Sequence, residues 1–232
     1  MDNWSDNKNN KKIVFFGDSV TYGGSYIDDA KIFTHMACKD FKELNIVCGN
    51  AGVNAYGIQN IIYRSKYDKR IGDIYIKVFI LIADDFYRGL QNSETAHFYL
   101  NEKKFFLPGI IEAINFLSVK YDLNKFIGKS NDTIIETNQF DLINESINLI
   151  NAEFKNLDSQ NQKFLAFYIH PKNNSSINKY IFNELNSKIT IINLKKYIKK
   201  NMYYDKIHLN ELGHKKVAEI VNIELKNFIK NN

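Results

Sequence analysis

The sequence has 232 residues, and its 31 Lys and Arg against 26 Asp and Glu give a formal net charge of +5 at pH 7. This small excess of positive charge, without a long run of one sign, does not favour binding to nucleic acid or to a membrane surface. Hydrophobic residues make up 44% and aromatic residues 14% of the chain, enough for a packed core, which excludes a wholly disordered protein.

Short, continuously apolar segments recur along the chain, at residues 13–16, 46–47, 78–83, 164–169 and 189–194. Such runs, rich in Ile, Val and Phe, are typical of strands that are buried on both faces. Between them, apolar residues spaced three or four apart predict helices from Phe140 to Leu157 and from about Asn210 to Ile229. The alternation predicts an α/β protein, a three-layer α/β/α sandwich with a flavodoxin-like parallel sheet of about five strands.

The chain between the third and fourth predicted strands is too long for a single crossover helix. It contains an aromatic-rich stretch at 98–106 and a predicted helix at 108–121, which begins at Pro108. We interpret residues 86–138 as an insertion near the carboxyl edge of the sheet, where α/β folds bind ligands, or as extra packing against the core. Because the chain shows neither a linker nor an internal repeat, we expect residues 1–232 to form a single domain.

A serine follows the first predicted strand, in Gly17-Asp18-Ser19, where a tight turn would expose its hydroxyl at the carboxyl edge of the sheet. A serine hydroxyl becomes a nucleophile at neutral pH only if a base accepts its proton. Near the other end of the chain, Asp205 and His208 are spaced so that the carboxylate can hold one imidazole nitrogen while the other faces Ser19. These three residues are therefore a candidate catalytic triad.

Four segments together resemble the blocks of the SGNH (GDSL-type) hydrolases, in the order of that family. They are Gly17-Asp18-Ser19, Asn50–Gly57, Ile80–Asp85 and Asp205-x-x-His208-Leu209-Asn210-x-x-Gly213-His214. The resemblance covers nearly the whole chain and implies a carboxylic ester hydrolase. It assigns Ser19 as the nucleophile, His208 as the base and Asp205 as the acid that orients the base.

The same resemblance implies an oxyanion hole with three donors: the backbone amide of Ser19, a backbone amide at Ala55, where the family has Gly, and a side chain at Asp84, where the family has Asn. An ionised Asp84 has no proton to donate and would repel the oxyanion, and losing one donor costs about 10²–10³ in rate. Asp84 could be protonated, Asn54 could replace it, the alignment could shift to Asp85, or the protein could bind its ligand with little turnover.

Other residues near the blocks are candidates for contacts with the substrate, although structural roles explain them as well. Arg88 could hold an anionic group, and the aromatic residues at 97–106 could stack on a sugar or pack on the core. We expect His214 to pack or cap rather than to take part in catalysis. The candidate substrate-binding residues are Asp18, Asn54, Tyr56, Arg88 and His170.

We expect a serine esterase that hydrolyses a small acyl ester, with an O-acetyl group on a carbohydrate as its substrate. The alternatives are an acyltransferase to sugar hydroxyls that uses the same triad, and a catalytically weak carbohydrate-binding relative. No metal-ligand cluster or nucleotide-binding motif is present, so we expect no metal and no cofactor.

The N-terminal residues, the apolar stretches and the two cysteines are informative about the cellular compartment of the protein. Residues 1–12 are polar without the apolar core of a signal peptide, and no stretch reaches the roughly 20 apolar residues of a membrane span. We expect a cytoplasmic protein, the alternative being an exported domain whose signal or anchor has been removed. A bridge between Cys38 and Cys48 is possible, but two free thiols are the preferred expectation.

Overall fold

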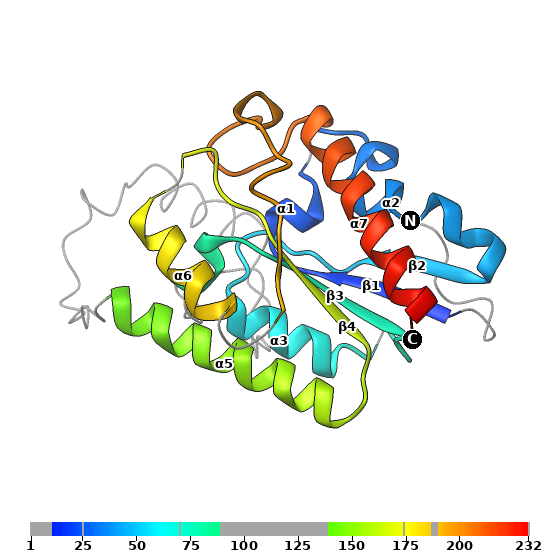
Figure 1. Ribbon diagram of the computed structural model, residues 1–232, viewed down its shortest axis with the longest axis horizontal. Coiled ribbons are helices and arrows are strands. Elements are labelled where there is room, and N and C mark those ends of the chain that lie inside the picture. The colour runs from blue at the N-terminus through cyan, green and yellow to red at the C-terminus, as the bar shows by residue number, and fades with distance from the viewer. Residues whose placement is uncertain are drawn as a thin grey trace, which may run out of the picture. The chain divides into compact units, whose positions relative to one another are not determined.

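A single parallel sheet forms the centre of the protein (Figure 1). The computed structural model describes residues 11–24, 26–69, 71–88, 139–173, 175–186 and 190–231, all within one compact unit of the chain. The strands follow the order β2-β1-β3-β4-β5 and every pair is parallel, which confirms the predicted α/β fold. Their bounds are Lys11–Phe16 (β1), Ile46–Asn50 (β2), Ile76–Leu81 (β3), Phe164–Tyr168 (β4) and Ile192–Asn193 (β5).

The strands lack the alternation of polar and apolar residues because helices cover both faces of the sheet. All six residues of β3 are buried, as are the last four of β1. Lys77 is the polar exception in β3: its ammonium group donates to the backbone carbonyl of Ser65 at 2.8 Å, and burial lowers the pKa of this side chain. A buried cation is tolerated here because it has a hydrogen-bond acceptor.

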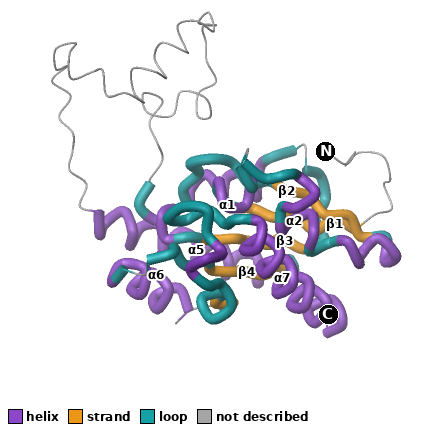
Figure 2. The backbone as a smooth tube through the Cα atoms, turned by 90° about the horizontal axis from the view of Figure 1, so that it is seen from above, coloured by secondary structure: helices purple, strands orange, loops and turns teal. Residues whose placement is uncertain are grey.

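Two groups of helices sandwich the sheet (Figures 1 and 2). The helices α2 (Phe33–Met36) and α7 (Glu211–Asn231) share one hydrophobic cluster with one face of the strands. The opposite face packs against α3 (Ile58–Tyr67), α5 (Gln139–Ser159) and α6 (Ser176–Asn186). The apolar stripes predicted for 140–157 and 210–229 thus lie in α5 and α7, on opposite sides of the sheet.

The chain leaves β3 through a short 3₁₀ helix, η3 (Ala83–Phe86), and the next helix that the structure describes is α5. Residues 89–138 lie outside the described part, so most of the insertion expected at 86–138, with its aromatic stretch at 98–106 and its helix at 108–121, lies outside it as well. The single-domain expectation also remains a prediction.

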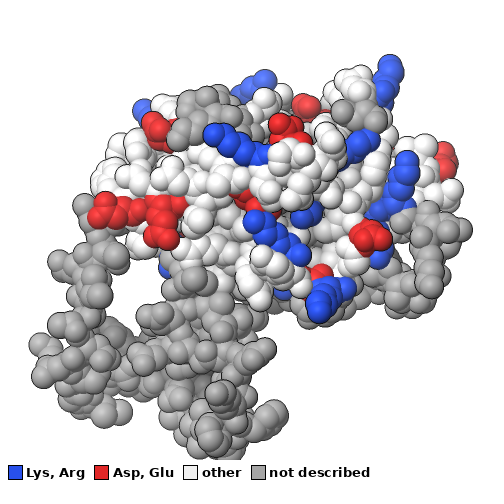
Figure 3. Space-filling model, turned by 90° about the horizontal axis from the view of Figure 1, so that it is seen from below, with Lys and Arg blue, Asp and Glu red and all other residues white. Residues whose placement is uncertain are grey.

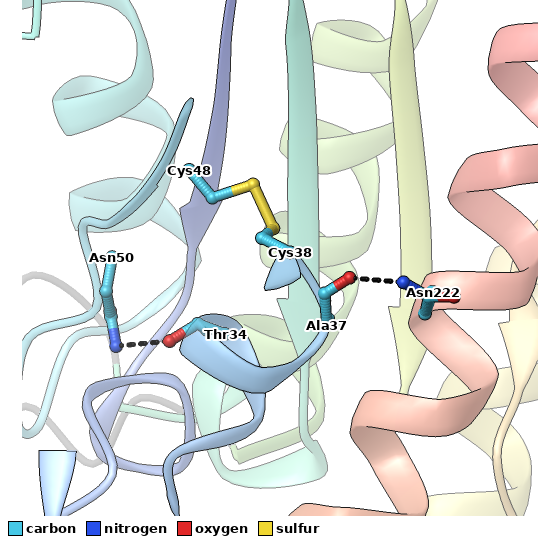
Figure 4. Close-up of a disulfide and its surroundings, with 6 residues drawn as sticks. All are labelled: Thr34, Ala37, Cys38, Cys48, Asn50 and Asn222. Carbon is cyan, nitrogen blue, oxygen red and sulfur yellow. Dashed lines mark hydrogen bonds between the residues drawn. A yellow bond between two sulfur atoms is a disulfide. The ribbon is translucent and has the colours of Figure 1, made fainter. Parts of the chain in front are cut away.

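The expectation of two free thiols is wrong, because Cys38 and Cys48 form a disulfide with a Cα–Cα distance of 6.1 Å (Figure 4). The chain reverses direction between them, in the 3₁₀ helix η2 (Lys39–Leu44), and this reversal returns Cys48 in β2 to the end of α2. Close by, the side-chain amide of Asn222 in α7 donates to the carbonyl of Ala37 at 2.7 Å. The end of α2 is therefore tied to both β2 and α7.

Basic and acidic side chains of the described residues are interspersed on the face seen in Figure 3, rather than gathered by sign. Within the described ranges, no helix is both long enough and apolar enough to cross a membrane.

Candidate active site

The turn after β1 carries Ser19 at the start of a short helix, α1 (Ser19–Tyr22). Asp18 caps this helix, because its Oδ1 accepts a hydrogen bond from the amide of Val20 at 2.9 Å. Gly17 has no room for a side chain: a Cβ there would lie 2.1 Å from Thr21 Oγ1 and 2.7 Å from the carbonyl oxygen of Ile80. The sequence Gly-Asp-Ser thus produces a sharp turn at the carboxyl end of a central strand.

A continuous chain of hydrogen bonds joins Ser19, His208 and Asp205. His208 Nε2 lies 2.9 Å from Ser19 Oγ, and His208 Nδ1 lies 2.7 Å from Asp205 Oδ2. Because the carboxylate accepts the proton on Nδ1, Nε2 is left as the acceptor for the serine hydroxyl. The structure brings together the three residues that the sequence singled out, in the order that proton transfer requires.

Asp205 is held in its ionised form. Partial burial opposes ionisation, but hydrogen bonds from the His208 ring and from the backbone amides of His208 and Ile207 outweigh it and lower the pKa of this carboxyl group. Both amide bonds, to Asp205 Oδ1, measure 2.8 Å. A carboxylate with these contacts can stabilise a positive imidazolium during the reaction.

Backbone hydrogen bonds within residues 203–209 hold the turn that carries His208, ahead of the start of α7. The amide of Tyr204 donates to the carbonyl of His208 at 2.8 Å, and Tyr203 forms an antiparallel bridge with Leu209. The cap of α7 is Asn210, whose Oδ1 accepts from the amide of Gly213 at 3.1 Å. Asp205 is therefore not needed as a helix cap, and its carboxylate is available to the histidine.

The start of the second family-like block, Asn50–Gly57, is hydrogen-bonded to the turn that carries Ser19. Asn50, at the end of β2, donates from Nδ2 to the carbonyl of Thr21 at 2.7 Å. The same group donates to Thr34 Oγ1 at 3.0 Å (Figure 4). Its Oδ1 accepts from the amide of Gly52 at 2.9 Å. A Cβ on Gly52 would lie 2.4 Å from the amide nitrogen of Tyr22, so only glycine permits this approach. Sequence reasoning placed Asn50 in a block but missed its anchoring role.

The positions aligned with the second and third donors of the oxyanion hole behave differently. Ala55 is exposed and has φ +63°, a left-handed conformation that glycine adopts more easily. Asp84 accepts a hydrogen bond from the Tyr87 hydroxyl on Oδ1 at 2.5 Å, and its Oδ2 lies 3.7 Å from Arg88 Nη2. Tyr87 and Arg88 therefore occupy both carboxyl oxygens of Asp84. Asn54, the alternative donor, lies exposed next to Ala55.

Arg88 links the three blocks to one another. Its Nη1 donates to Asp18 Oδ2 at 2.9 Å and to the carbonyl of Tyr56 at 3.2 Å, and lies 3.6 Å from Asp85 Oδ1. Ser19 Oγ also lies 3.2 Å from Asp18 Oδ2, so this oxygen and His208 Nε2 are alternative acceptors for the one hydroxyl proton. The guanidinium is thus directed into the protein, toward the nucleophile turn. This link joins residues that are far apart in the sequence, so no local sequence pattern predicted it.

Asp85 is a second feature that sequence reasoning missed. Its side chain is fully buried, and Oδ2 accepts from the amide of Ile82 at 2.9 Å. Burial, together with the nearby charge of Asp18, raises the pKa of Asp85 well above its usual range, although Arg88 opposes the shift. Arg88 therefore connects Asp85 with Asp18, the residue that precedes the candidate nucleophile.

A pocket of about 630 Å³ opens beside His208. Asp84 and Tyr87 line it, together with the amide and hydroxyl side chains of Asn173, Ser175 and Asn178.

The remaining candidates lie elsewhere. The ring of His170 is buried against Tyr168 and Phe182, and it borders a neighbouring pocket of about 440 Å³. His214 is fully buried, accepts from the amide of Phe33 at 3.3 Å and stacks on its ring, the packing role expected for it. In the described part of the chain, no three His, Cys, Asp or Glu residues gather as metal ligands would.

Comparison with known proteins gives a structural match without a sequence match. No protein-family model matches the chain, and neither does any curated protein. Among solved structures, the psychrotrophic esterase EstA from Pseudoalteromonas sp. matches with a TM-score of 0.60 and 13% identity, covering 96% of this chain and 100% of that chain. The acetyl xylan esterase AlAXEase matches with a TM-score of 0.55 and 16% identity, covering 90% of this chain and 96% of that chain.

A third structure, the lipase/acylhydrolase from Enterococcus faecalis, matches with a TM-score of 0.52 and 15% identity, covering 94% of this chain and 96% of that chain. The structural neighbours across the chain are SGNH/GDSL-family esterases and lipolytic acylhydrolases. At these identities the likeness establishes the fold alone.

Proposed function

We propose that this protein, which has the fold of the SGNH-type esterases, is itself a serine esterase that removes a small acyl group, with an O-acetyl group on a carbohydrate as its substrate. The observation that carries the proposal is the unbroken chain of hydrogen bonds from Asp205 through His208 to Ser19, next to an open pocket. A nucleophile, a base and an ionised orienting acid in this arrangement are the requirements of acyl transfer through a serine ester.

In the proposed reaction, Ser19 Oγ attacks the ester carbonyl as its proton passes to His208 Nε2. The tetrahedral intermediate collapses, and the alcohol leaves with the proton that the imidazolium returns. Water then gives a proton to His208 and attacks the acyl-enzyme, and the acid is released as Ser19 regains its proton. Asp205 stabilises the imidazolium in both halves, and the backbone amides of Ser19 and Ala55 are the proposed donors to the oxyanion.

Asp84 determines how well that oxyanion is stabilised. Its two oxygens face Tyr87 and Arg88, so Asp84 lines the pocket as an acceptor and supplies no donor. An amide at this position would restore a donor, and one such donor contributes about 10²–10³ in rate. Asp84→Asn should therefore raise kcat. An unchanged or lower kcat would mean that another group completes the hole.

Two observations support a carbohydrate as the alcohol part of the substrate. The pocket beside His208 carries the hydrogen-bonding side chains Asn173, Ser175 and Asn178, which suit a ligand rich in hydroxyl groups. Among the structural neighbours are an acetyl xylan esterase and a two-domain esterase active on acetylated mannans.

The decisive experiment compares the wild type, Ser19→Ala and Ser159→Ala on p-nitrophenyl acetate and on acetylated xylan. Ser159 is a matched control, because it is an exposed serine at the end of α5. We expect loss of activity in Ser19→Ala alone. Hydrolysis that survives in Ser19→Ala would refute the proposed nucleophile. A wild type inactive on both esters, with sugar binding retained, would instead favour the weak carbohydrate-binding relative, which the carboxylate of Asp84 makes the second candidate.

Acyl transfer to a sugar hydroxyl needs the same triad and differs only in the acceptor of the acyl group. Product analysis with a free sugar present distinguishes the two reactions: hydrolysis yields acetate, whereas transfer yields a newly acetylated sugar.

We also propose that the protein works in an oxidising compartment rather than in the cytoplasm. The disulfide between Cys38 and Cys48 supports this, because such bonds persist in secreted and periplasmic proteins and are rare in reducing compartments. Alkylation of free thiols in intact cells, followed by mass spectrometry, tests it: unmodified cysteines are expected, and full alkylation of both would place the protein in a reducing environment.

A further inference from the structure

Three exposed tyrosines belong to the segments that carry the candidate catalytic residues or contact them. Tyr22 ends the helix that Ser19 begins, and Tyr204 directly precedes Asp205. The exposed fractions are 49% for Tyr22, 38% for Tyr26 and 63% for Tyr204. Their rings are therefore accessible to a ligand from solvent.

Two of these tyrosines form a flat, ordered surface. The rings of Tyr26 and Tyr204 stack with their centroids 4.5 Å apart and their planes 7° from parallel. The hydroxyl of Tyr26 donates to the carbonyl of Leu209 at 3.1 Å, which fixes the ring. Burial, with the charge of Asp205, raises the pKa of Tyr26 to about 12, so this hydroxyl, already neutral at physiological pH, keeps its proton in alkaline solution as well.

The stacked pair lies next to the reacting atoms. The rings of Tyr26 and His208 form a T-shaped pair, with 6.2 Å between centroids and 68° between planes, and His208 Nε2 lies 2.9 Å from Ser19 Oγ. Neither tyrosine lines the pocket of about 630 Å³ that also borders His208. A substrate whose carbonyl carbon lies at Ser19 can therefore extend in two directions, into the pocket and over the tyrosine pair.

We infer that the Tyr26–Tyr204 pair is a binding subsite for a sugar ring of the substrate, stacked on the free face of Tyr204; this inference rests on the proposed esterase function. A pyranose presents one face of C–H groups that can cover an aromatic ring, while its hydroxyl groups stay in water at the rim. The pair is flat, rigid and open to solvent, which suits such a ring. A long acyl chain, by contrast, needs an enclosed apolar cavity.

The test measures how Tyr204→Ala changes the choice between two esters. One is a tri-O-acetylated methyl xylopyranoside, which has a sugar ring, and the other is ethyl acetate, which has none. An aromatic stacking contact contributes about 0.5–1.5 kcal/mol, so the ratio of kcat/KM for the sugar ester to that for ethyl acetate should fall about twofold to thirteenfold. The fall should come from a higher KM for the sugar ester.

Matched variants separate stacking from structural damage. Tyr204→Phe keeps the ring and should keep the ratio. Tyr63→Ala removes an exposed tyrosine of another aromatic pair, Tyr63–Tyr67 on α3, and should also keep it. If Tyr204→Ala only loosened the turn that carries His208, both esters would lose rate equally and the ratio would not move. That result would overturn the inference.

Failure of the proposed function can be recognised separately, because a wild type that hydrolyses neither ester would refute the esterase activity and not the sugar-binding subsite. In that case, calorimetric titration with xylohexaose tests whether the subsite exists. Binding by the wild type that weakens in Tyr204→Ala and not in Tyr63→Ala would support the subsite, whereas equal binding by all three, or none by the wild type, would overturn it.

Discussion

Ala55 offers a test of the loop that is proposed to stabilise the oxyanion. With φ at +63°, this residue is in the left-handed region, which costs a residue with a Cβ about 1–2 kcal/mol relative to glycine. Ala55→Gly removes that strain but gives the unfolded chain more freedom, which lowers stability by about 0.4–1 kcal/mol. Since Ala55 is exposed and loses little packing, we expect a net gain of about 0.5–1 kcal/mol in the free energy of unfolding.

Ala30 is the matched control. It is also exposed, but it lies in the 3₁₀ helix Asp29–Lys31 and has a negative φ. Ala30→Gly should therefore destabilise the protein by about 0.5–1 kcal/mol, the opposite sign for the same substitution. Urea unfolding at pH 7, followed by far-UV circular dichroism, measures both variants. If Ala55→Gly lowered the free energy of unfolding as much as Ala30→Gly does, the strain at this loop would be refuted.

Three further perturbations follow from the same contacts. Arg88→Met leaves the buried carboxylate of Asp18 without its cation and should destabilise the protein by about 3–5 kcal/mol. The control Lys226→Met breaks an exposed ion pair and should cost at most about 1 kcal/mol, so similar urea midpoints for the two variants would contradict a stabilising role of the buried pair. Burial lowers the pKa of His214 to about 4, so the unfolded chain takes up a proton first as pH falls from about 6.5. The wild type should therefore lose roughly 3 kcal/mol of stability between pH 7 and pH 4. His214→Gln should reduce this loss, and parallel stability profiles of the two proteins against pH would exclude His214 as its cause. Replacing both disulfide cysteines by serine opens a short loop and should cost about 3 kcal/mol in unfolding free energy, with an unchanged melting temperature as the contrary result.

Much of the fold could be predicted because its cause is local. Strands buried on both faces leave continuous apolar runs, and helices packed on one side leave stripes, so the runs at 13–16 and 78–83 identified β1 and β3 without any knowledge of their neighbours. The run at 189–194 predicted a longer strand than the observed β5, which pairs with β4 only through Ile192 and Asn193; residue 189 lies outside the described part of the chain. The three triad residues could be found because Gly-Asp-Ser and Asp-x-x-His are short patterns.

Contacts between distant segments could not be found in this way. The cysteines are ten residues apart, a spacing that fits free thiols as well as a bridge, and only the reversal through η2 joins them. Arg88 meets Asp18 because β1 and β3 are adjacent and end at the same edge. Tyr26 meets Tyr204 through a loop that carries no periodic signal.

The sequence by itself determined the order of strands and helices, the faces that they bury and the residue types available for acyl-transfer chemistry, since each of these depends on neighbours along the chain. The tertiary structure decided which side chains meet: the alignment of Asp205, His208 and Ser19, the hydrogen bond from Tyr87 to Asp84, and the link between Arg88 and the nucleophile turn. The physical reason is that hydrogen bonds act over about 3 Å, while the paths of the connecting loops, which place their partners, are set by the packing of the whole molecule.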